Sequence, residues 1–253
     1  MAEVVIPARF NGPPETAHGG YACAVAAQFL GWSAEVSLRR PPPLERPLDV
    51  HRDDDGSVTL LDGDAVVMLA RPADLHLDIP DPVSLAEAQA AAAACPWLAR
   101  HPFPTCFGCG PERRPGDGMR EFPGPVAGRK GLWATPWIPD ASLAGSGGEV
   151  NPLFTFSALD CPSGAGAIDA TGASKVHVLG RLRGQVLGPA RAEEPHVVIA
   201  WPTGVDGRKR TGGAAVFAGP KLCAVAEATW IELADPTSFG AQDEQFGERA
   251  PGR

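Results

Sequence analysis

The sequence predicts an α+β protein built from two similar halves. Each half contains one apolar helical run, over residues 21–30 and 152–168, behind a loop rich in polar residues and glycine. Each run is followed by several strand-like segments joined by short turns, a pattern typical of an antiparallel sheet. Between the halves, residues 101–130 are rich in Gly, Pro and charge, as expected for a linker.

The first half continues from its helical run into four strand signals. Strands are expected where apolar and polar residues alternate between turn-forming Pro, Asp and Gly residues. These segments cover residues 34–40, 48–52, 57–61 and 65–71. A second helix is expected over residues 82–97, because Ser84 and Glu87 have the spacing of a capping box and alanines fill the segment.

The second half repeats this order, which indicates an internal duplication. A strand is expected over residues 131–138, and the helical run at 152–168 should kink or end early at Pro162. Three long strand signals follow, over residues 175–187, 196–202 continuing into 210–218, and 222–233. The predicted units are residues 1–100, the linker at residues 101–130, residues 131–235, and a polar tail at residues 236–253.

Composition and charge exclude several classes of protein. The net charge of −8 argues against a non-specific nucleic-acid binder, so we expect no nucleic-acid partner. The N-terminus lacks the pattern of a signal peptide, and the longest apolar run, residues 86–95, is too short to span a bilayer. We therefore expect a cytoplasmic protein without a membrane partner. The six cysteines are irregularly spaced, and a chain of 253 residues needs no disulfide framework.

The loop from Asn11 to Gly20 is the most informative local feature. A polar, Pro-rich stretch runs into Gly19 and Gly20, where the first helical run begins. Glycine allows close approach to the backbone, and the first N–H groups of a helix lie unpaired at its positive end. Such a loop can hold an anion or a polarised carbonyl oxygen. The alternative interpretation is an ordinary helix N-terminus that begins with glycine.

One long helix followed by an antiparallel sheet resembles the hotdog fold, and two such units in one chain resemble a double hotdog. The resemblance depends on His18-Gly19-Gly20 at the helix start, Arg-Pro-Pro-Pro-Leu at residues 40–44, and the pattern over residues 206–228. These features are similar to acyl-CoA thioesterases of the phenylacetyl-CoA type and their double-hotdog relatives of the acyl-CoA thioesterase II type. The resemblance implies two tandem hotdog folds, each an antiparallel sheet around a central helix, that pair as a pseudo-dimer.

The two halves divide the catalytic parts of the single-hotdog enzymes between them. In those enzymes the helix opens with His-Gly-Gly and carries an acid nine positions later, and two subunits pair so that glycine and acid meet at one thioester. Here Ala27 lies nine positions after His18, whereas Asp160 lies nine positions after Asn151, where Asn-Pro-Leu replaces His-Gly-Gly. If the halves pair like two subunits, one complete site forms.

The resemblance implies hydrolysis of an acyl-CoA or similar acyl thioester at that site. The Gly19 amide, with Gly20, would polarise the carbonyl, and Asp160 would act as base or nucleophile. Burial among apolar neighbours would raise the pKa of Asp160 toward neutrality, which suits a base. Asn11 would orient water or the carbonyl, and His18 would brace the loop.

Further binding residues and partners are expected on the same basis. Asn151 is a candidate substrate-binding residue, and Arg208 and Lys209 could meet the 3′-phosphate of CoA. A small-molecule acyl-CoA is the expected partner, CoA enters only as part of the substrate, and no other cofactor is expected. A dimer of double hotdogs is the expected oligomer.

Several alternatives remain open at this level. Asp160 can also be a satisfied buried carboxyl, and the chain can be a non-catalytic acyl-CoA-binding or sensing protein. A hydratase or dehydratase of the same fold is less well supported, because no His accompanies Asp160. Cys106-x-x-Cys109 has no second pair at zinc spacing, so no metal site is expected.

Overall fold

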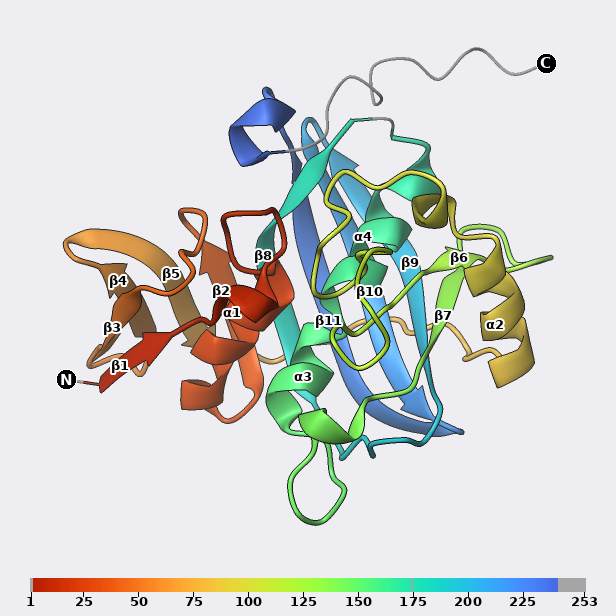
Figure 1. Ribbon diagram of the computed structural model, residues 1–253, viewed down its shortest axis with the longest axis horizontal. Coiled ribbons are helices and arrows are strands. Elements are labelled where there is room, and N and C mark those ends of the chain that lie inside the picture. Colours follow the sequence, from red (N-terminus) through yellow and green to blue (C-terminus); the bar gives the residue numbers. More distant parts are fainter. Residues whose placement is uncertain (1, 174, 241–253) are drawn as a thin grey trace.

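A single antiparallel sheet runs through the computed structural model, which describes residues 2–173 and 175–240. Within these residues the sheet has 11 strands in the order β1-β3-β4-β5-β2-β8-β11-β10-β9-β7-β6 (Figure 1). The strands are β1 (Ala2–Val5), β2 (Ser33–Leu38), β3 (Pro47–Arg52), β4 (Val58–Asp62), β5 (Ala65–Pro72), β6 (Gly124–Pro125), β7 (Trp133–Trp137), β8 (His177–Val186), β9 (His196–Asp206), β10 (Lys209–Ala218) and β11 (Lys221–Glu232). The predicted strand segments are present, but the single signal over residues 196–218 forms two antiparallel strands, β9 and β10, and β1 and β6 were not predicted.

The two halves of the chain meet where β2 pairs with β8. This pairing is antiparallel, with Ala34 opposite Gly184 and Val36 opposite Leu182. Strands from residues 2–72 lie on one side of the junction, and strands from residues 124–232 lie on the other. The sheet is therefore continuous across the two halves.

Three helices lie over this sheet near the junction (Figure 1). They are α1 (Gly19–Ala27), α3 (Pro152–Ser157) and α4 (Asp160–Ala167). All residues of α1 after Gly19 are buried, and so are all residues of α4. Small side chains, mostly Ala, Gly, Ser and Cys, make this possible, because a helix that is buried on all sides must present apolar or compact groups all round.

The helical run at residues 152–168 is split into α3 and α4, at a point the sequence did not specify. Ala158 and Leu159 separate the two helices, and Pro162 lies in the first turn of α4. A proline ring clashes with the carbonyl group four residues earlier, here that of Ala158, so a continuous helix is disfavoured. The sequence analysis placed Asp160 in the middle of a helix; the structure corrects this, and Asp160 is the first residue of α4.

The loops that precede α1 and α3 have the same backbone hydrogen bonds. Gly12 N donates to Thr16 O over 2.9 Å, and Gly145 N donates to Glu149 O over 3.0 Å. The N-cap residues that follow have nearly identical backbone angles, φ −56° and ψ 127° at His18 and φ −55° and ψ 127° at Asn151. This shared geometry supports an internal duplication despite the low residue identity between the halves.

The remaining helix, α2 (Leu85–Ala93), begins with the predicted capping box. Ser84 accepts from Glu87 N, and the Glu87 carboxylate accepts from Ser84 N over 2.8 Å. The helix ends at Ala93, earlier than expected, and a short 3₁₀ turn (Pro96–Leu98) follows. It packs on β7 and β6, so these residues, which the sequence assigns to the first half, lie against the second (Figure 1).

Five other 3₁₀ turns occur in the described chain, at Ala8–Phe10, Gln28–Leu30, Ala141–Leu143, Asp169–Thr171 and Pro236–Phe239.

The C-terminal end of the predicted units is described only in part. Of the polar tail predicted at residues 236–253, residues 241–253 lie outside the described part. Among the described residues, no helix combines the length and the hydropathy needed to cross a bilayer.

Candidate active site

The N-termini of α1 and α4 meet at the carboxylate of Asp160. Oδ2 of Asp160 accepts a hydrogen bond from Gly20 N over 2.5 Å and lies 3.0 Å from His18 Nε2. His18 and Asp160 are both almost fully buried, at 2 % exposure each. The contact joins residues 140 positions apart in the chain. The structure therefore brings together His18, Gly20 and Asp160. Gly20 was expected to help polarise the substrate carbonyl, but its N–H is bonded to Asp160 instead.

Close packing at Gly20 makes this contact possible. A Cβ atom on Gly20 would lie 2.4 Å from Cβ of Asp160 and 2.8 Å from the carbonyl oxygen of Ser157. Any other residue would therefore push α1 away from the α3–α4 junction. The second glycine of the His-Gly-Gly sequence is required here by steric fit.

Both ring nitrogens of His18 are engaged within the protein. Its Nδ1 accepts a hydrogen bond from Tyr21 N over 3.2 Å, so the hydrogen of the neutral ring lies on Nε2. That N–H is positioned to donate to Asp160 Oδ2 and also lies 3.2 Å from Cys161 Sγ. A ring that uses both nitrogens in this way has no free lone pair with which to take a proton.

Burial sets the proton affinity of Asp160. Removal from water raises the pKa of Asp160 from 3.8 to about 6, although the nearby His18 and the Gly20 N–H act in the opposite direction. Oδ2 is anchored by two donors, whereas Oδ1 is buried and has no hydrogen-bond partner among the described residues. A carboxylate with one anchored and one unpartnered oxygen can take a proton at Oδ1 near neutral pH.

The Gly19 amide is the candidate donor for a polarised carbonyl. It is the first N–H of α1, and no hydrogen bond to it is recorded among residues 2–173 and 175–240. Gly20 N, in contrast, is already bonded to Asp160. A helix N-terminus favours negative charge at this position. Of the two glycines, Gly19 is thus the one available to a ligand.

Gly19 and Asp160 line the same pocket, which has a volume of about 390 Å³. Its wall also includes His18, Cys106, Cys109 and Cys161. Further apolar wall residues come from the Pro96–Leu98 turn, the linker, the end of α4, β8, β11 and the C-terminal 3₁₀ turn: Trp97, Phe103, Ile168, Leu179, Trp230, Ile231 and Phe239. Pockets of this size and lining hold small organic ligands.

The other predicted site residues lie outside this pocket. Asn11 is buried, and its amide donates to Gly12 O over 3.1 Å and to Thr105 Oγ1 over 3.2 Å, while its Oδ1 accepts from Arg113. The bonds with Thr105 and Arg113 attach the linker to the loop before α1. The Asn11 side chain is therefore engaged within the protein, and nothing places it at the carbonyl position.

Asn151, Arg208 and Lys209 are also away from the pocket wall. Asn151 caps α3, with its Oδ1 accepting from Leu153 N over 3.0 Å. Arg208 and Lys209 are exposed at the β9–β10 turn. Lys209 stands opposite the wall residue Ile231 in the β10–β11 ladder, so the turn adjoins the pocket. Two cations that the sequence analysis did not select, Arg39 and Arg40, lie in the wall itself.

The linker contributes more to the site than the sequence suggested. Phe107 is 1 % exposed and packs edge-on against Phe10, with ring centroids 4.9 Å apart. Glu121 is fully buried, neither of its oxygens has a partner in the described residues, and burial raises its pKa well above the usual value. The linker passes in front of α4 in Figure 1, and its residues Phe103, Cys106 and Cys109 line the pocket, so this segment covers the site.

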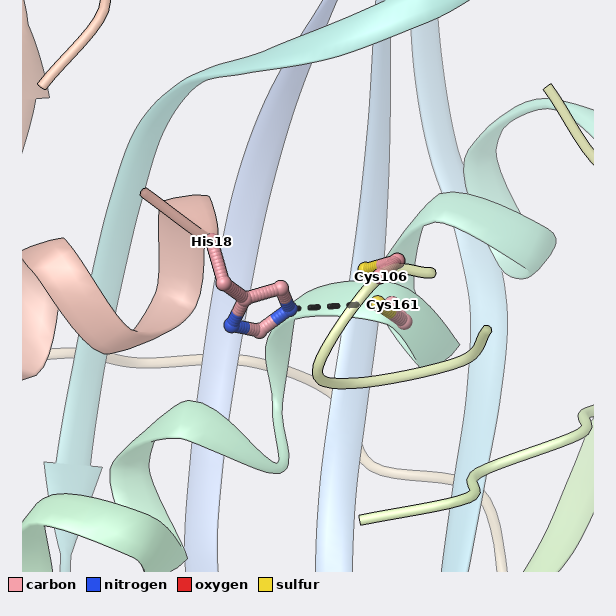
Figure 2. A group of neighbouring side chains, drawn as sticks. All are labelled: His18, Cys106 and Cys161. Carbon is pink, nitrogen blue, oxygen red and sulfur yellow. Dashed lines mark hydrogen bonds between the residues drawn. The ribbon is translucent and has the colours of Figure 1, made fainter. Parts of the chain in front are cut away.

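Three thiols next to Asp160 were also missed by the sequence analysis. Hydrogen bonds with the Cys109 and Cys161 thiols hold the pKa of Cys106 well below its usual value. Figure 2 shows His18, Cys106 and Cys161 pointing toward one another from α1, the linker and α4. The Cys-x-x-Cys spacing was the available signal, but nothing in the sequence connected it to Cys161.

Comparison with known proteins confirms the fold. No family model matches the sequence, and no match was found among curated proteins. Among solved structures, the tesB protein of Mycobacterium avium subsp. paratuberculosis is 13% identical, covers 88% of this chain and 89% of its own, and superimposes with a TM-score of 0.57. A protein from Thermobifida fusca YX described as a thioesterase II is 13% identical, with coverage of 91% of both chains and a TM-score of 0.57. One from Lactobacillus plantarum described as an oleoyl thioesterase is 9% identical, with coverage of 92% and 96% and a TM-score of 0.55.

The chain therefore shares its fold, over nearly its whole length, with proteins described as thioesterases. This likeness confirms the resemblance inferred from the sequence at the level of the fold. At 9% to 13% identity it concerns the arrangement of helices and strands and does not extend to the activity. The chemistry must be argued from the site.

Proposed function

We propose that the protein hydrolyses an acyl-CoA or a related acyl thioester in the pocket beside α1 and α4. The observation that carries this proposal is the placement of two groups in the wall of one pocket: the Gly19 amide, which has no partner among the described residues, and the Asp160 carboxylate. A donor for the carbonyl oxygen and a base for water are the two groups that hydrolysis of a thioester needs.

The reaction follows from these two groups. The Gly19 N–H donates to the carbonyl oxygen and stabilises the negative charge that develops on it. Asp160 Oδ1 takes a proton from a water molecule whose oxygen bonds to the carbonyl carbon, or Oδ1 bonds to that carbon directly. The C–S bond then breaks, and the electron pair leaves on the CoA sulfur. In the first route the sulfur takes the proton held by Asp160, and the acid and CoA are released. In the second route the thiolate takes a proton from solvent, and water hydrolyses the acyl–Asp160 anhydride to release the acid and restore the carboxylate.

This site is composite, with one part from each half of a tandem hotdog pseudo-dimer. The matching hydrogen bonds in the loops before α1 and α3 support this arrangement, as does the continuous sheet across β2 and β8. Ala27 and Asn151 occupy the positions in the other potential site that correspond to Asp160 and His18. The second site therefore lacks both the acid and the His-Gly-Gly sequence.

The pocket wall suggests how the substrate lies. The acyl group would contact the apolar side chains, among them Trp97, Leu179 and Trp230. Arg39 and Arg40 are exposed cations in the same wall, and they suit the phosphates of CoA. Arg208 and Lys209 would serve the 3′-phosphate only if CoA extends past Ile231 to the β9–β10 turn.

Release of free CoA thiol from a panel of acyl-CoA esters tests the proposed activity. We expect the purified protein to hydrolyse at least one aliphatic or aromatic member with a kcat well above the rate without enzyme. Binding of the same esters is measured in parallel by calorimetry. Tight binding without thiol release would contradict the proposal and favour the alternative of a non-catalytic acyl-CoA-binding protein.

The pH dependence of hydrolysis tests the role of Asp160 as base. Because burial raises the pKa of Asp160 to about 6, the active deprotonated form predominates above this pH. We expect kcat/KM, measured in chelator-treated buffer, to be flat above about pH 7 and to fall about tenfold per unit below about pH 6. A profile that stays flat down to pH 4.5 would show that Asp160 is not the base.

A further inference from the structure

The thiols of Cys106, Cys109 and Cys161 form a compact cluster beside the proposed active site. Cys106 Sγ, Cys161 Sγ and a ring nitrogen of His18 lie within 4.8 Å of one another. The sulfur atoms of Cys106 and Cys109 are 3.7 Å apart. Two thiolates on one tetrahedral zinc ion, each about 2.3 Å from the metal, would be about 3.8 Å apart. The spacing of the sulfur atoms therefore suits a shared metal ion.

Two imidazole rings complete the surroundings of the sulfur atoms. Nε2 of His18 lies 3.2 Å from Cys161 Sγ, and Nε2 of His101 lies 3.2 Å from Cys109 Sγ. Nδ1 of His101 accepts from Phe103 N over 2.9 Å, as Nδ1 of His18 accepts from Tyr21 N. The hydrogen of each neutral ring therefore lies on Nε2. That of His101 faces Cys109 Sγ, and that of His18 is shared between Cys161 Sγ and Asp160 Oδ2. Such N–H donors stabilise thiolates that bind a metal.

The backbone of the linker is shaped to bring its two thiols against α4. A Cβ atom on Gly108 would lie 2.6 Å from both Cys161 Sγ and His18 Nε2, so only glycine lets the loop come this close. Gly110 N donates to Cys106 O over 2.8 Å and closes a tight turn around the two cysteines. Cys-x-x-Cys turns of this kind are common at structural zinc sites.

The other cysteines of the chain show that burial alone does not explain the cluster. Cys23, Cys95 and Cys223 are also buried free thiols, yet none of them is recorded in contact with another thiol or with a His ring within the described residues. Cys223, for example, donates only to the backbone oxygens of Pro189 and Lys221. Isolated thiols behave as small apolar groups. Three thiols and two imidazoles in one place fit a metal site better.

We propose that Cys106, Cys109 and Cys161 bind one zinc ion, with His18 and His101 donating hydrogen bonds to the sulfur ligands. The ion joins the linker to α4 in the wall of the pocket, which all three cysteines line. Three protein ligands leave the fourth tetrahedral position for a molecule in the pocket. Zinc is the preferred ion because soft thiolate ligands in tetrahedral geometry select it over Mg²⁺, Ca²⁺ or Mn²⁺.

The metal content of the purified protein tests the proposal without any substrate, so its outcome is independent of the thioesterase activity. Elemental analysis should find about one zinc per chain in protein prepared without chelators. Replacement of zinc by Co²⁺ should produce the visible bands of tetrahedral cobalt and a near-ultraviolet thiolate-to-cobalt band. Cys106→Ser and Cys161→Ser should each lower the zinc content at least tenfold.

Cys223→Ser is the matched control, because its thiol is equally buried but lies outside the cluster and a hydroxyl can keep its hydrogen bonds. This variant should retain the zinc and cobalt signals of the parent. Absence of the cobalt bands in the parent protein would overturn the proposal even if a cysteine variant failed to fold. So would a count of four reactive thiols in the denatured, unreduced protein in place of the six free thiols, because it indicates a disulfide.

Discussion

Asp160→Asn is expected to lower kcat for thioester hydrolysis by about 10²–10⁴-fold, which is the usual contribution of a general base. Asn keeps the shape of Asp, and its side-chain oxygen can still accept from Gly20 N, so the contact between α1 and α4 should persist. It cannot take a proton from water at the position of Oδ1. Steady-state release of CoA thiol measures the loss, and turnover equal to that of the parent would exclude Asp160 as base or nucleophile.

Stability measurements separate this loss from unfolding. The pKa of Asp160 is about 6 in the folded protein and 3.8 as the reference value, a difference of about 2 units or about 3 kcal/mol. Because this pKa is raised, the contribution of Asp160 to stability is fully present below pH 3.8 and is lost as the pH rises through about 6. Because Asn carries no charge, the variant should be at least as stable as the parent at pH 8 in urea unfolding, an advantage that disappears near pH 4.

Asp140→Asn is the control for a lost carboxylate elsewhere. Asp140 caps the turn at Ala141–Leu143 and does not line the pocket. Asp and Asn are similarly good N-cap residues. We therefore expect parental turnover and stability from this variant. A comparable loss of hydrolysis in Asp140→Asn would show that the effect at position 160 is a general charge effect.

Gly20→Ala is expected to damage both stability and activity. The added Cβ would lie 2.4 Å from Cβ of Asp160 and 2.8 Å from Ser157 O, and the second of these is backbone that cannot turn aside. Overpacking of this kind costs about 1–3 kcal/mol, or about 2–10 °C in melting temperature for a chain of this size. Separation of α1 from α4 also breaks the bond from Gly20 N to Asp160, so kcat should fall at least tenfold.

Gly145→Ala tests whether replacing any glycine near the start of α1 or α3 by alanine has the same effect. Gly145 has the same position in the loop before α3 as Gly12 has in the loop before α1, and a Cβ there meets no heavy atom within 4 Å. Its melting temperature and kcat should match those of the parent. If Gly20→Ala had the melting temperature and kcat of Gly145→Ala, the result would contradict the close approach of α1 to α4 at Gly20.

Much of the fold could be predicted from local patterns. The alternating segments became strands, and Ser84 and Glu87 formed the capping box that their spacing indicated. Pro162 interrupted the second helical run, although the break fell two or more residues before the proline, because the clash of its ring lies four residues upstream. Patterns of this kind depend on neighbours in the chain, so a single sequence contains them.

The candidate site was only partly predictable. The spacing of His18 and Asp160, each at the equivalent helix in its half, indicated a shared site, and their side chains lie 3.0 Å apart. The role of Asn11 was assigned from its place before the helix, but its amide bonds to Gly12 and Thr105. A side chain's partners depend on segments that are distant in sequence, and no local pattern reports them.

By itself, the sequence determined the two-part α+β plan, the glycine start of α1 and the single acid of α4, because residue type and spacing decide where helices and strands begin. The tertiary structure alone decided that the linker covers the site and that Cys106, Cys109 and Cys161 meet. Long-range bonds such as Phe107 N to Asn11 O, 2.7 Å, hold the linker there. Such contacts form only when the whole chain is packed, since each joins segments that no local preference brings together.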